Sequence, residues 1–106
     1  MPTAVLDATA IADWDSFHTE SQRAFGFPDF YGRNLNAWHD CLTHLDDGMS
    51  RFDLAADEVL TIEVRGAHDF AQRCPQIASG LMEAVAFVNH RNLESGAPAR
   101  LVLLLA

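Results

Sequence analysis

The chain has 106 residues, of which 49% are apolar, and its seven basic and fifteen acidic residues give a formal net charge of −8. A chain of this length and composition is expected to form one compact domain, spanning residues 1–106. The negative charge argues against nonspecific nucleic-acid binding, because contacts to phosphates need Lys and Arg side chains. It favours a basic protein as the partner.

The first predicted elements are a short strand at residues 3–6 and a helix that follows it. Asp13 can cap the start of this helix, and Gly26 can end it in a left-handed conformation. The spacing of its apolar residues predicts that the helix buries Trp14, Phe17, Ala24 and Phe25.

An aromatic-rich turn at residues 27–33 leads into a second helix, which Asn34 is expected to cap. Pro28 restricts Phe27 to an extended conformation, and Gly32 permits a positive φ before Asn34. These restrictions predict a rigid turn.

The second helix has one apolar and one polar face. The spacing predicts that its inward stripe consists of Leu35, Trp38, Leu42 and Leu45. The outward polar face is predicted to consist of Asn36, His39, Asp40 and Thr43. We expect a docking surface here, because the aromatic residues Phe30 and Tyr31 offer rigid contact area and Asp40 offers a fixed negative charge to a basic partner.

The second half of the chain predicts two further strands joined by helices. Residues 44–58 form a polar connection with five acidic residues, either a solvated loop or a second acidic contact patch. Residues 59–64 (VLTIEV) read as a strand, and residues 101–105 (LVLLL) read as a central strand buried on both faces. A short helix at residues 68–73 lies between them.

A longer helix is expected to begin at Pro75 and to stop before Gly96 and Pro98. Helices between strands are crossover connections, so the strands should be parallel. The residues therefore predict a small layered α/β fold, in which a three-stranded parallel sheet packs with about four helices.

The turn and second helix resemble the barstar family of intracellular ribonuclease inhibitors. The resemblance rests on one run of residues: Pro28, Phe30, Tyr31, Gly32, Asn34, Leu35, Asp40, Cys41, Leu42 and Thr43. Weaker similarity extends to Phe17–His18 and to residues 59–64 and 101–105. It implies a barstar-like fold, residence in the cytoplasm, and a monomer when free. The implied partner is a basic extracellular ribonuclease or ribonuclease toxin, such as barnase, whose active site is plugged by the second helix and its preceding turn in a 1:1 complex.

Carried over by position, the resemblance implies a contact surface formed by Phe30, Tyr31, Gly32, Asn34, Asn36, His39, Asp40, Thr43, His44 and Leu45. Asp40 holds the position of the family's dominant hot-spot aspartate. Asn36 stands where the best-known inhibitor has another aspartate, and His39 and Leu45 stand where it has tryptophans. No clear counterpart of its further acidic contact is found at residues 88–90.

These departures leave two alternatives open. The target is either a ribonuclease, with barnase itself a less suitable one, or a different basic protein that is bound by a barstar-fold interaction or immunity module. His39 adds a hypothesis: if it faces a cationic active site, its protonation near neutral pH would weaken binding.

An enzyme is a third possible class, because Cys41 and His44 are three residues apart and Asp40 adjoins Cys41. Asp40 lies roughly a hundred degrees from Cys41 around a helix, which argues against a catalytic arrangement. Neither the five histidines nor Cys41 and Cys74 show a metal-ligand spacing, and no nucleotide-binding motif occurs. We expect free thiols, no cofactor and no metal. The sequence shows neither a leader peptide nor an apolar run long enough to cross a membrane.

Overall fold

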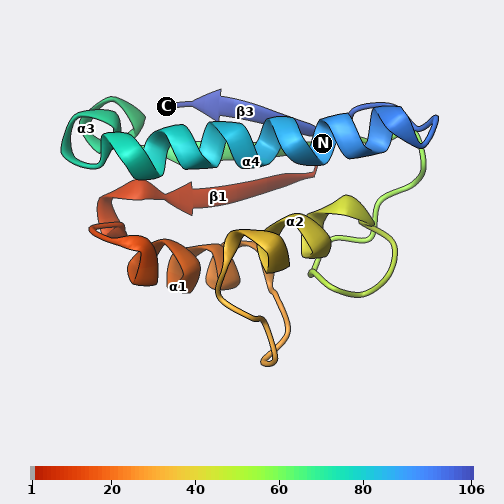
Figure 1. Ribbon diagram of the computed structural model, residues 1–106, viewed down its shortest axis with the longest axis horizontal. Coiled ribbons are helices and arrows are strands. Elements are labelled where there is room, and N and C mark those ends of the chain that lie inside the picture. Colours follow the sequence, from red (N-terminus) through yellow and green to blue (C-terminus); the bar gives the residue numbers. More distant parts are fainter. Residues whose placement is uncertain (1) are drawn as a thin grey trace.

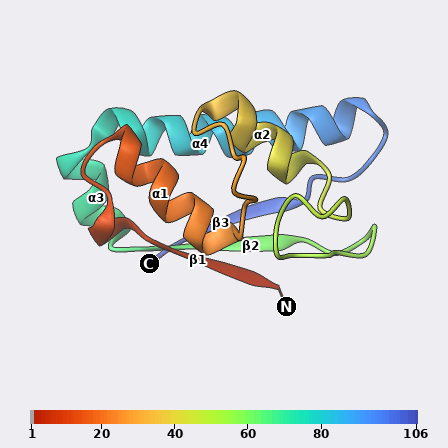
Figure 2. The same cartoon turned by 90° about the horizontal axis from the view of Figure 1, so that it is seen from below.

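The computed structural model describes residues 2–106 and shows an α/β fold in which four helices pack with a three-stranded parallel sheet. The strand order is β1-β2-β3, and α1, α2 and α4 lie on one side of the sheet (Figures 1 and 2). The elements, in chain order, are β1 (Thr3–Asp7), the 3-10 turn η1 (Ala8–Ala10), α1 (Trp14–Phe25), α2 (Leu35–Thr43), β2 (Leu60–Arg65), α3 (Ala67–Arg73), α4 (Pro75–Glu94) and β3 (Leu101–Leu105).

The ends of the helices follow from local sequence signals. At the start of α1, the Asp13 carboxylate accepts from the backbone N–H of Ser16 at 2.8 Å, and the Ser16 hydroxyl accepts from the Asp13 N–H at 3.0 Å. Gly26 ends the helix with φ 67°, in the left-handed region. Pro75 occupies the first turn of α4. These helix boundaries confirm the predicted ones.

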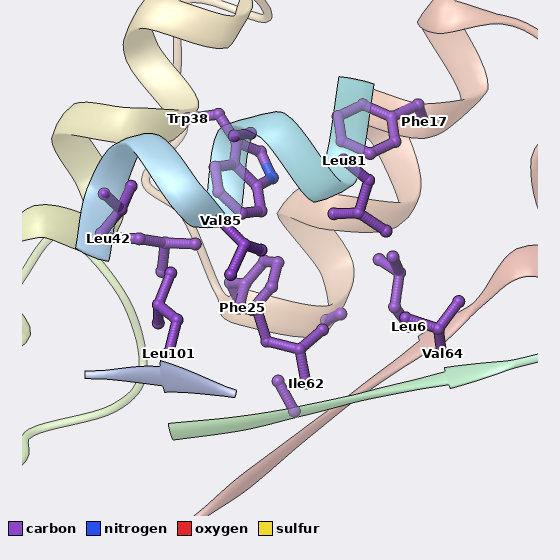
Figure 3. Close-up of a cluster of buried hydrophobic side chains, with 14 of the residues drawn as sticks. Leu6, Phe17, Phe25, Trp38, Leu42, Ile62, Val64, Leu81, Val85 and Leu101 are labelled. Carbon is purple, nitrogen blue, oxygen red and sulfur yellow. The ribbon is translucent and has the colours of Figure 1, made fainter. Parts of the chain in front are cut away.

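The hydrophobic core lies between the sheet and the three helices on its face (Figure 3). Trp38 of α2 is fully buried, and its indole N–H donates to the Ser21 hydroxyl at 3.3 Å. Its ring lies 5.8 Å from that of Phe25. Truncation of a fully buried aromatic side chain of this kind typically costs about 3–5 kcal/mol. The core therefore fixes α2 to α1 through aromatic packing.

The prediction that residues 101–105 form a central strand was wrong. β2 is central, pairing with β1 on one side and with β3 on the other, so β3 is an edge strand. A continuous apolar run is typical of strands in parallel sheets whose two faces are both covered by helices. Here the face away from the helices carries no helix in residues 2–106, and Val102 and Leu104 are about half exposed on it.

Trp14 was predicted to be buried, and it is 38% exposed instead. It lies in the first turn of α1, where its ring packs edge-on against Phe17 at 5.4 Å. The ring also stacks with His18 at 6.3 Å and contacts α4, where a Cβ at Gly80 would come within 2.6 Å of it. Gly80 therefore lets Trp14 rest on the α4 backbone at the rim of the core, with part of the indole in solvent.

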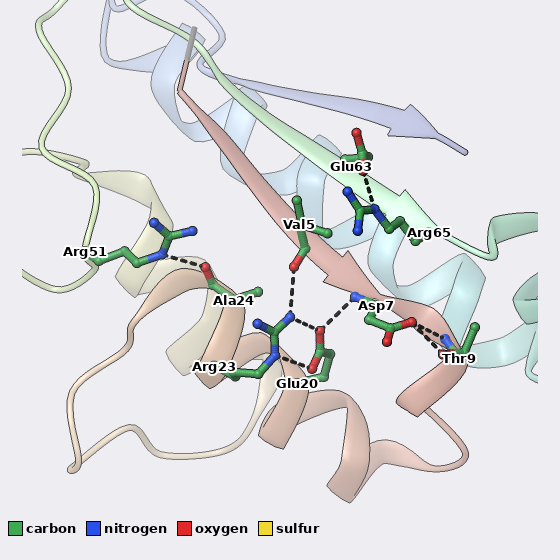
Figure 4. A network of polar contacts seen from close by, with 9 residues as sticks. All are labelled: Val5, Asp7, Thr9, Glu20, Arg23, Ala24, Arg51, Glu63 and Arg65. Atoms are coloured by element: carbon green, nitrogen blue, oxygen red, sulfur yellow. Dashed lines mark hydrogen bonds and ion pairs between the residues drawn. The ribbon is translucent and has the colours of Figure 1, made fainter.

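Side chains of α1 cover the outer edge of β1 (Figure 4). Glu20 accepts from the Asp7 N–H at 2.7 Å, and Arg23 donates to the Val5 carbonyl at 3.1 Å. Arg23 also pairs with Glu20, which is nearly buried. These contacts occupy backbone groups that an edge strand would otherwise leave open.

The long connection from α2 to β2 is attached to α1. Arg51 donates from its backbone N–H to the Phe25 carbonyl at 2.8 Å and from its guanidinium to the Ala24 carbonyl at 3.0 Å (Figure 4). The Leu54 N–H donates to the Leu45 carbonyl at 2.9 Å. The acidic side chains of this connection are exposed. Within residues 2–106, no helix has the length and apolar character needed to cross a membrane.

Candidate partner-binding face

The turn before α2 is anchored from the inside. The Tyr31 hydroxyl lies 2.6 Å from Nδ1 of His18, and both side chains are buried. The Pro28 carbonyl accepts from the Tyr31 N–H at 2.9 Å and from the Gln22 side chain at 3.0 Å. The Phe27 and Tyr31 rings are 4.7 Å apart. The turn is thus held by packing and hydrogen bonds at several points.

Gly32 permits a positive φ, but the left-handed residue of the turn is its neighbour Arg33, at φ 53°. The guanidinium of Arg33 explains how a non-glycine residue is held there, since it donates to the carbonyl and carboxylate of Asp15 at 2.9 and 2.8 Å and to the Thr19 hydroxyl at 2.9 Å. These bonds to α1 offset the strain of the left-handed conformation. The next residue, Asn34, caps α2 as predicted by accepting from the Ala37 N–H at 2.8 Å.

A ridge of exposed side chains runs along α2. It consists of Asn36 and Asp40, which lie one helical turn apart on one side of α2, and of the exposed His44, which directly follows the helix. Phe30 stands in the preceding turn with 75% of its surface exposed. A hollow of about 150 Å³ separates the turn from the helix and is lined by Phe30, Tyr31, Gly32, Ala37, Asp40, Cys41 and Met49. The structure therefore brings Phe30, Gly32 and Asp40 together, with Asn34 exposed at the start of the helix.

Four of the predicted contact residues are buried within the chain itself: Tyr31, His39, Thr43 and Leu45. The prediction that His39 and Thr43 share an exposed face with Asp40 was wrong. α2 packs on the core with one side and on α4 with a second side, and only the core contact is visible from the apolar spacing. Leu45 belongs to the core, as the apolar stripe predicted.

The contact between α2 and α4 is aromatic around His39. The His39 ring stacks on Phe87 of α4, with 4.3 Å between the ring centres. Neither ring nitrogen has a hydrogen-bond partner among the residues that the structure describes. Burial foremost, and then the nearby Arg91, lower the pKa of His39, while Asp40 opposes this shift. Burial therefore favours the neutral imidazole, and the ring lies in the contact with α4 instead of on the exposed ridge.

Asp40 forms an ion pair that the sequence did not reveal. Its Oδ1 accepts from Nη1 of Arg91 in α4 at 2.8 Å, and the same nitrogen donates to the Thr43 hydroxyl at 3.2 Å. The guanidinium carbon lies 4.8 Å from the centre of the Phe87 ring. Fifty-one residues separate Arg91 from Asp40, so no local spacing signals the pair. Arg91 directly follows residues 88–90, where no counterpart of the family's further acidic contact is found.

The surroundings of Cys41 do not favour a nucleophile. Burial foremost, with the Asp40 and Asp47 carboxylates, raises the pKa of its thiol to about 11, so little thiolate forms at neutral pH. His44 is exposed and makes no hydrogen bond to this sulfur among the described residues. Both cysteines are buried free thiols. No group of three or more potential metal-ligating side chains occurs within residues 2–106.

Comparison with known proteins identifies the family of the chain. A search among curated proteins finds no match. A family model described as "Barstar (barnase inhibitor)" matches residues 1–103, which is nearly the whole chain. The chain therefore belongs to the barstar family.

Proposed function

We propose that the chain is a stoichiometric 1:1 inhibitor of a basic, barnase-like microbial ribonuclease. In this proposal α2 and its preceding turn cover the active site, and Asp40 takes the place of a substrate phosphate. The observation that carries it is the position of Asp40, an exposed carboxylate on a helix ridge beside the exposed Phe30 ring. Membership of a family of barnase inhibitors supports the same function.

Charge is the main source of affinity in this mechanism. An active site that binds RNA phosphates presents Arg, Lys or His side chains, and Asp40 can accept charge-assisted hydrogen bonds from them in a site that loses its water. Removing one partner of such a buried pair typically costs about 2–5 kcal/mol, because the other charge stays buried and unpaired. The net charge of −8 would accelerate encounter with a basic partner.

The other predicted residues divide into two roles. Phe30 supplies a rigid aromatic anchor, and Asn36 and His44 flank Asp40 with polar side chains. The buried residues act as supports: Tyr31 holds the turn, His39 and Thr43 fix the flank of α2 against α4, and Leu45 anchors the helix end. Asn34 and Gly32 shape the entry into the helix.

A second candidate function is an immunity or interaction module for a basic protein that is not a nuclease. The observation that favours it is the composition of the ridge. Asn36 stands where the best-known inhibitor has a second carboxylate, and Arg91 neutralises part of the charge of Asp40. The ridge is therefore less acidic than the net charge of the chain suggests. Either function depends on binding alone, with no catalytic group and no cofactor, by a cytoplasmic protein that is a monomer when free.

Titration of a barnase-type ribonuclease with the wild-type protein tests the proposal, with Asp40→Ala and Asp69→Ala as variants. Asp69 is a matched control, because it is also an exposed carboxylate paired with an arginine, Arg73, but lies on α3. We expect full inhibition at one equivalent by the wild type and by Asp69→Ala, and a loss of at least about a hundredfold in affinity for Asp40→Ala. Equal inhibition by all three proteins would remove Asp40 from this role, and no inhibition would favour the second candidate.

A further inference from the structure

The Asp40 carboxylate is only half occupied within the chain. Its Oδ1 accepts from Arg91, whereas Oδ2 has no hydrogen-bond partner among the described residues. The side chains of Asp40 and Arg91 are 69% and 40% exposed. An incoming protein that covers the ridge therefore meets both members of the ion pair, and not the carboxylate alone.

Arg91 is held in this position by three contacts. Its Nη1 is shared between Asp40 and the Thr43 hydroxyl, and its guanidinium lies over the Phe87 ring. Thr43 is itself fixed, since its hydroxyl donates to the His39 carbonyl at 2.6 Å. A planar guanidinium anchored at one end and over one face loses little freedom when it binds. Swinging Arg91 out of the interface would break these contacts, so it stays as a fixed positive charge.

The free donors of Arg91 complete a two-part recognition pattern. Nε and Nη2 have no hydrogen-bond partner within residues 2–106. The ridge therefore presents a free acceptor, Oδ2 of Asp40, close to free donors of Arg91. The complement of this pattern is a cation beside a carboxylate, because a guanidinium binds a carboxylate through two parallel hydrogen bonds.

A uniformly cationic cleft fits this pattern poorly. A like charge about 4 Å from Arg91 would cost about 1 kcal/mol in water and about 4 kcal/mol at the effective dielectric constant typical of a protein surface. Covering the ridge removes water, so the repulsion would grow as the complex forms. A carboxylate of the target at the same place would instead attract the guanidinium of Arg91.

We propose that Arg91 is a contact residue that sets specificity, and that the target cleft carries a carboxylate beside its cations, placed to receive Arg91. This inference rests on the proposed function, because it takes the ribonuclease active site as the surface that meets the ridge. It adds a selection rule: ribonucleases whose clefts have a carboxylate next to the phosphate-binding cations are inhibited, and those whose clefts are only cationic are not.

A double-mutant cycle tests the inference, with inhibition of a barnase-type ribonuclease as the measurement. Arg91→Met keeps apolar contact with Phe87 and removes the charge. Arg65→Met is the matched control, because Arg65 also pairs with a carboxylate, Glu63 at 2.6 Å, but lies on β2 (Figure 4). On the ribonuclease side, each carboxylate of the active-site cleft is replaced in turn by its amide, and binding of these variants is followed by calorimetry. Urea unfolding of every inhibitor variant identifies losses that come from misfolding.

We expect Arg91→Met to weaken binding at least about tenfold and Arg65→Met to change it by less than about twofold. One amide variant of the ribonuclease should lose the same factor with the wild-type inhibitor and lose little more with Arg91→Met. Tighter or unchanged binding by Arg91→Met overturns the inference, as does a loss that couples to no carboxylate of the cleft, and both results leave the proposed function intact. Failure of the wild type to bind the ribonuclease overturns the proposed function together with this inference.

Discussion

The ring of His39 in α2 stacks on the ring of Phe87 in α4, with 4.3 Å between their centres. This contact places a titratable ring in an aromatic interface where neither of its nitrogens has a partner among the described residues. The same Phe87 ring lies under the guanidinium of Arg91, which holds Asp40. His39, Phe87 and Arg91 thus form one cluster, which joins α2 to α4 and also holds Asp40 in place on the ridge.

The first prediction concerns acid stability. The pKa of His39 is lowered in the folded chain by burial and by Arg91, so the unfolded chain binds a proton more readily than the folded one. Stability from the neutral ring is fully present above the unfolded pKa of about 6.5 and is lost as the pH falls from there through the lowered folded value. His18, with a pKa lowered first by burial, contributes in the same direction.

Urea unfolding between pH 8 and pH 5 measures this effect. His39→Phe keeps an aromatic ring against Phe87 and removes the titration, so its stability should fall less steeply with acidification than that of the wild type. Identical slopes for the two proteins would show that His39 is not responsible.

The second prediction concerns the anchor of the turn. Tyr31→Phe removes the hydroxyl that lies 2.6 Å from His18 Nδ1 and leaves a buried ring nitrogen unsatisfied. The free energy of unfolding should fall by about 1–3 kcal/mol. The double variant Tyr31→Phe with His18→Phe removes both polar partners, and in urea unfolding it should recover part of this loss. Additive losses in the double variant would show that the two side chains do not interact.

The third prediction separates binding from folding at Phe30. Because 75% of this side chain is exposed, Phe30→Ala should change the free energy of unfolding by no more than about 0.5 kcal/mol. Its affinity for the ribonuclease should fall at least about tenfold, since a rigid aromatic anchor is lost. Calorimetric titration and urea unfolding of the same sample give both quantities. Unchanged affinity would exclude Phe30 from the interface.

The fourth prediction concerns the open sheet face. Leu104 is 49% exposed on β3, an edge strand whose sequence carries no charge. Leu104→Lys places a charge on this edge, and charged residues there oppose pairing between chains. Light scattering on heating should show less aggregation, with unfolding in urea nearly unchanged. Faster aggregation of the variant would show that this edge is not where chains associate.

Local signals in the sequence were sufficient to predict the element types and several boundaries. Asp13, Gly26 and Asn34 form caps with residues at most four positions away, so their roles can be deduced from neighbouring residues. The parallel sheet followed from helices that separate the strands. The motif around Asp40 predicted the exposed part of the face for the same reason, since Asn36 and Asp40 lie one turn apart.

The remaining features depend on contacts between distant segments. The strand at residues 101–105 is an edge because, in the described structure, it pairs with β2 alone, and its apolar sequence does not contain this information. His39 is buried by Phe87, and Asp40 is paired by Arg91, which are both on a helix about fifty residues away. The positive φ fell on Arg33 because α1 supplies partners for its guanidinium.

Competition with an active-site ligand tests most directly whether the ridge covers a ribonuclease active site. Calorimetric titration of a barnase-type ribonuclease with this protein would be performed with and without a saturating 3′-mononucleotide, whose phosphate occupies the substrate site. We expect one-to-one binding whose apparent affinity falls in proportion to the nucleotide concentration, because Asp40 and the phosphate need the same cations. Binding with the same affinity in the presence of the nucleotide would contradict the account, since the protein would then bind outside the active site.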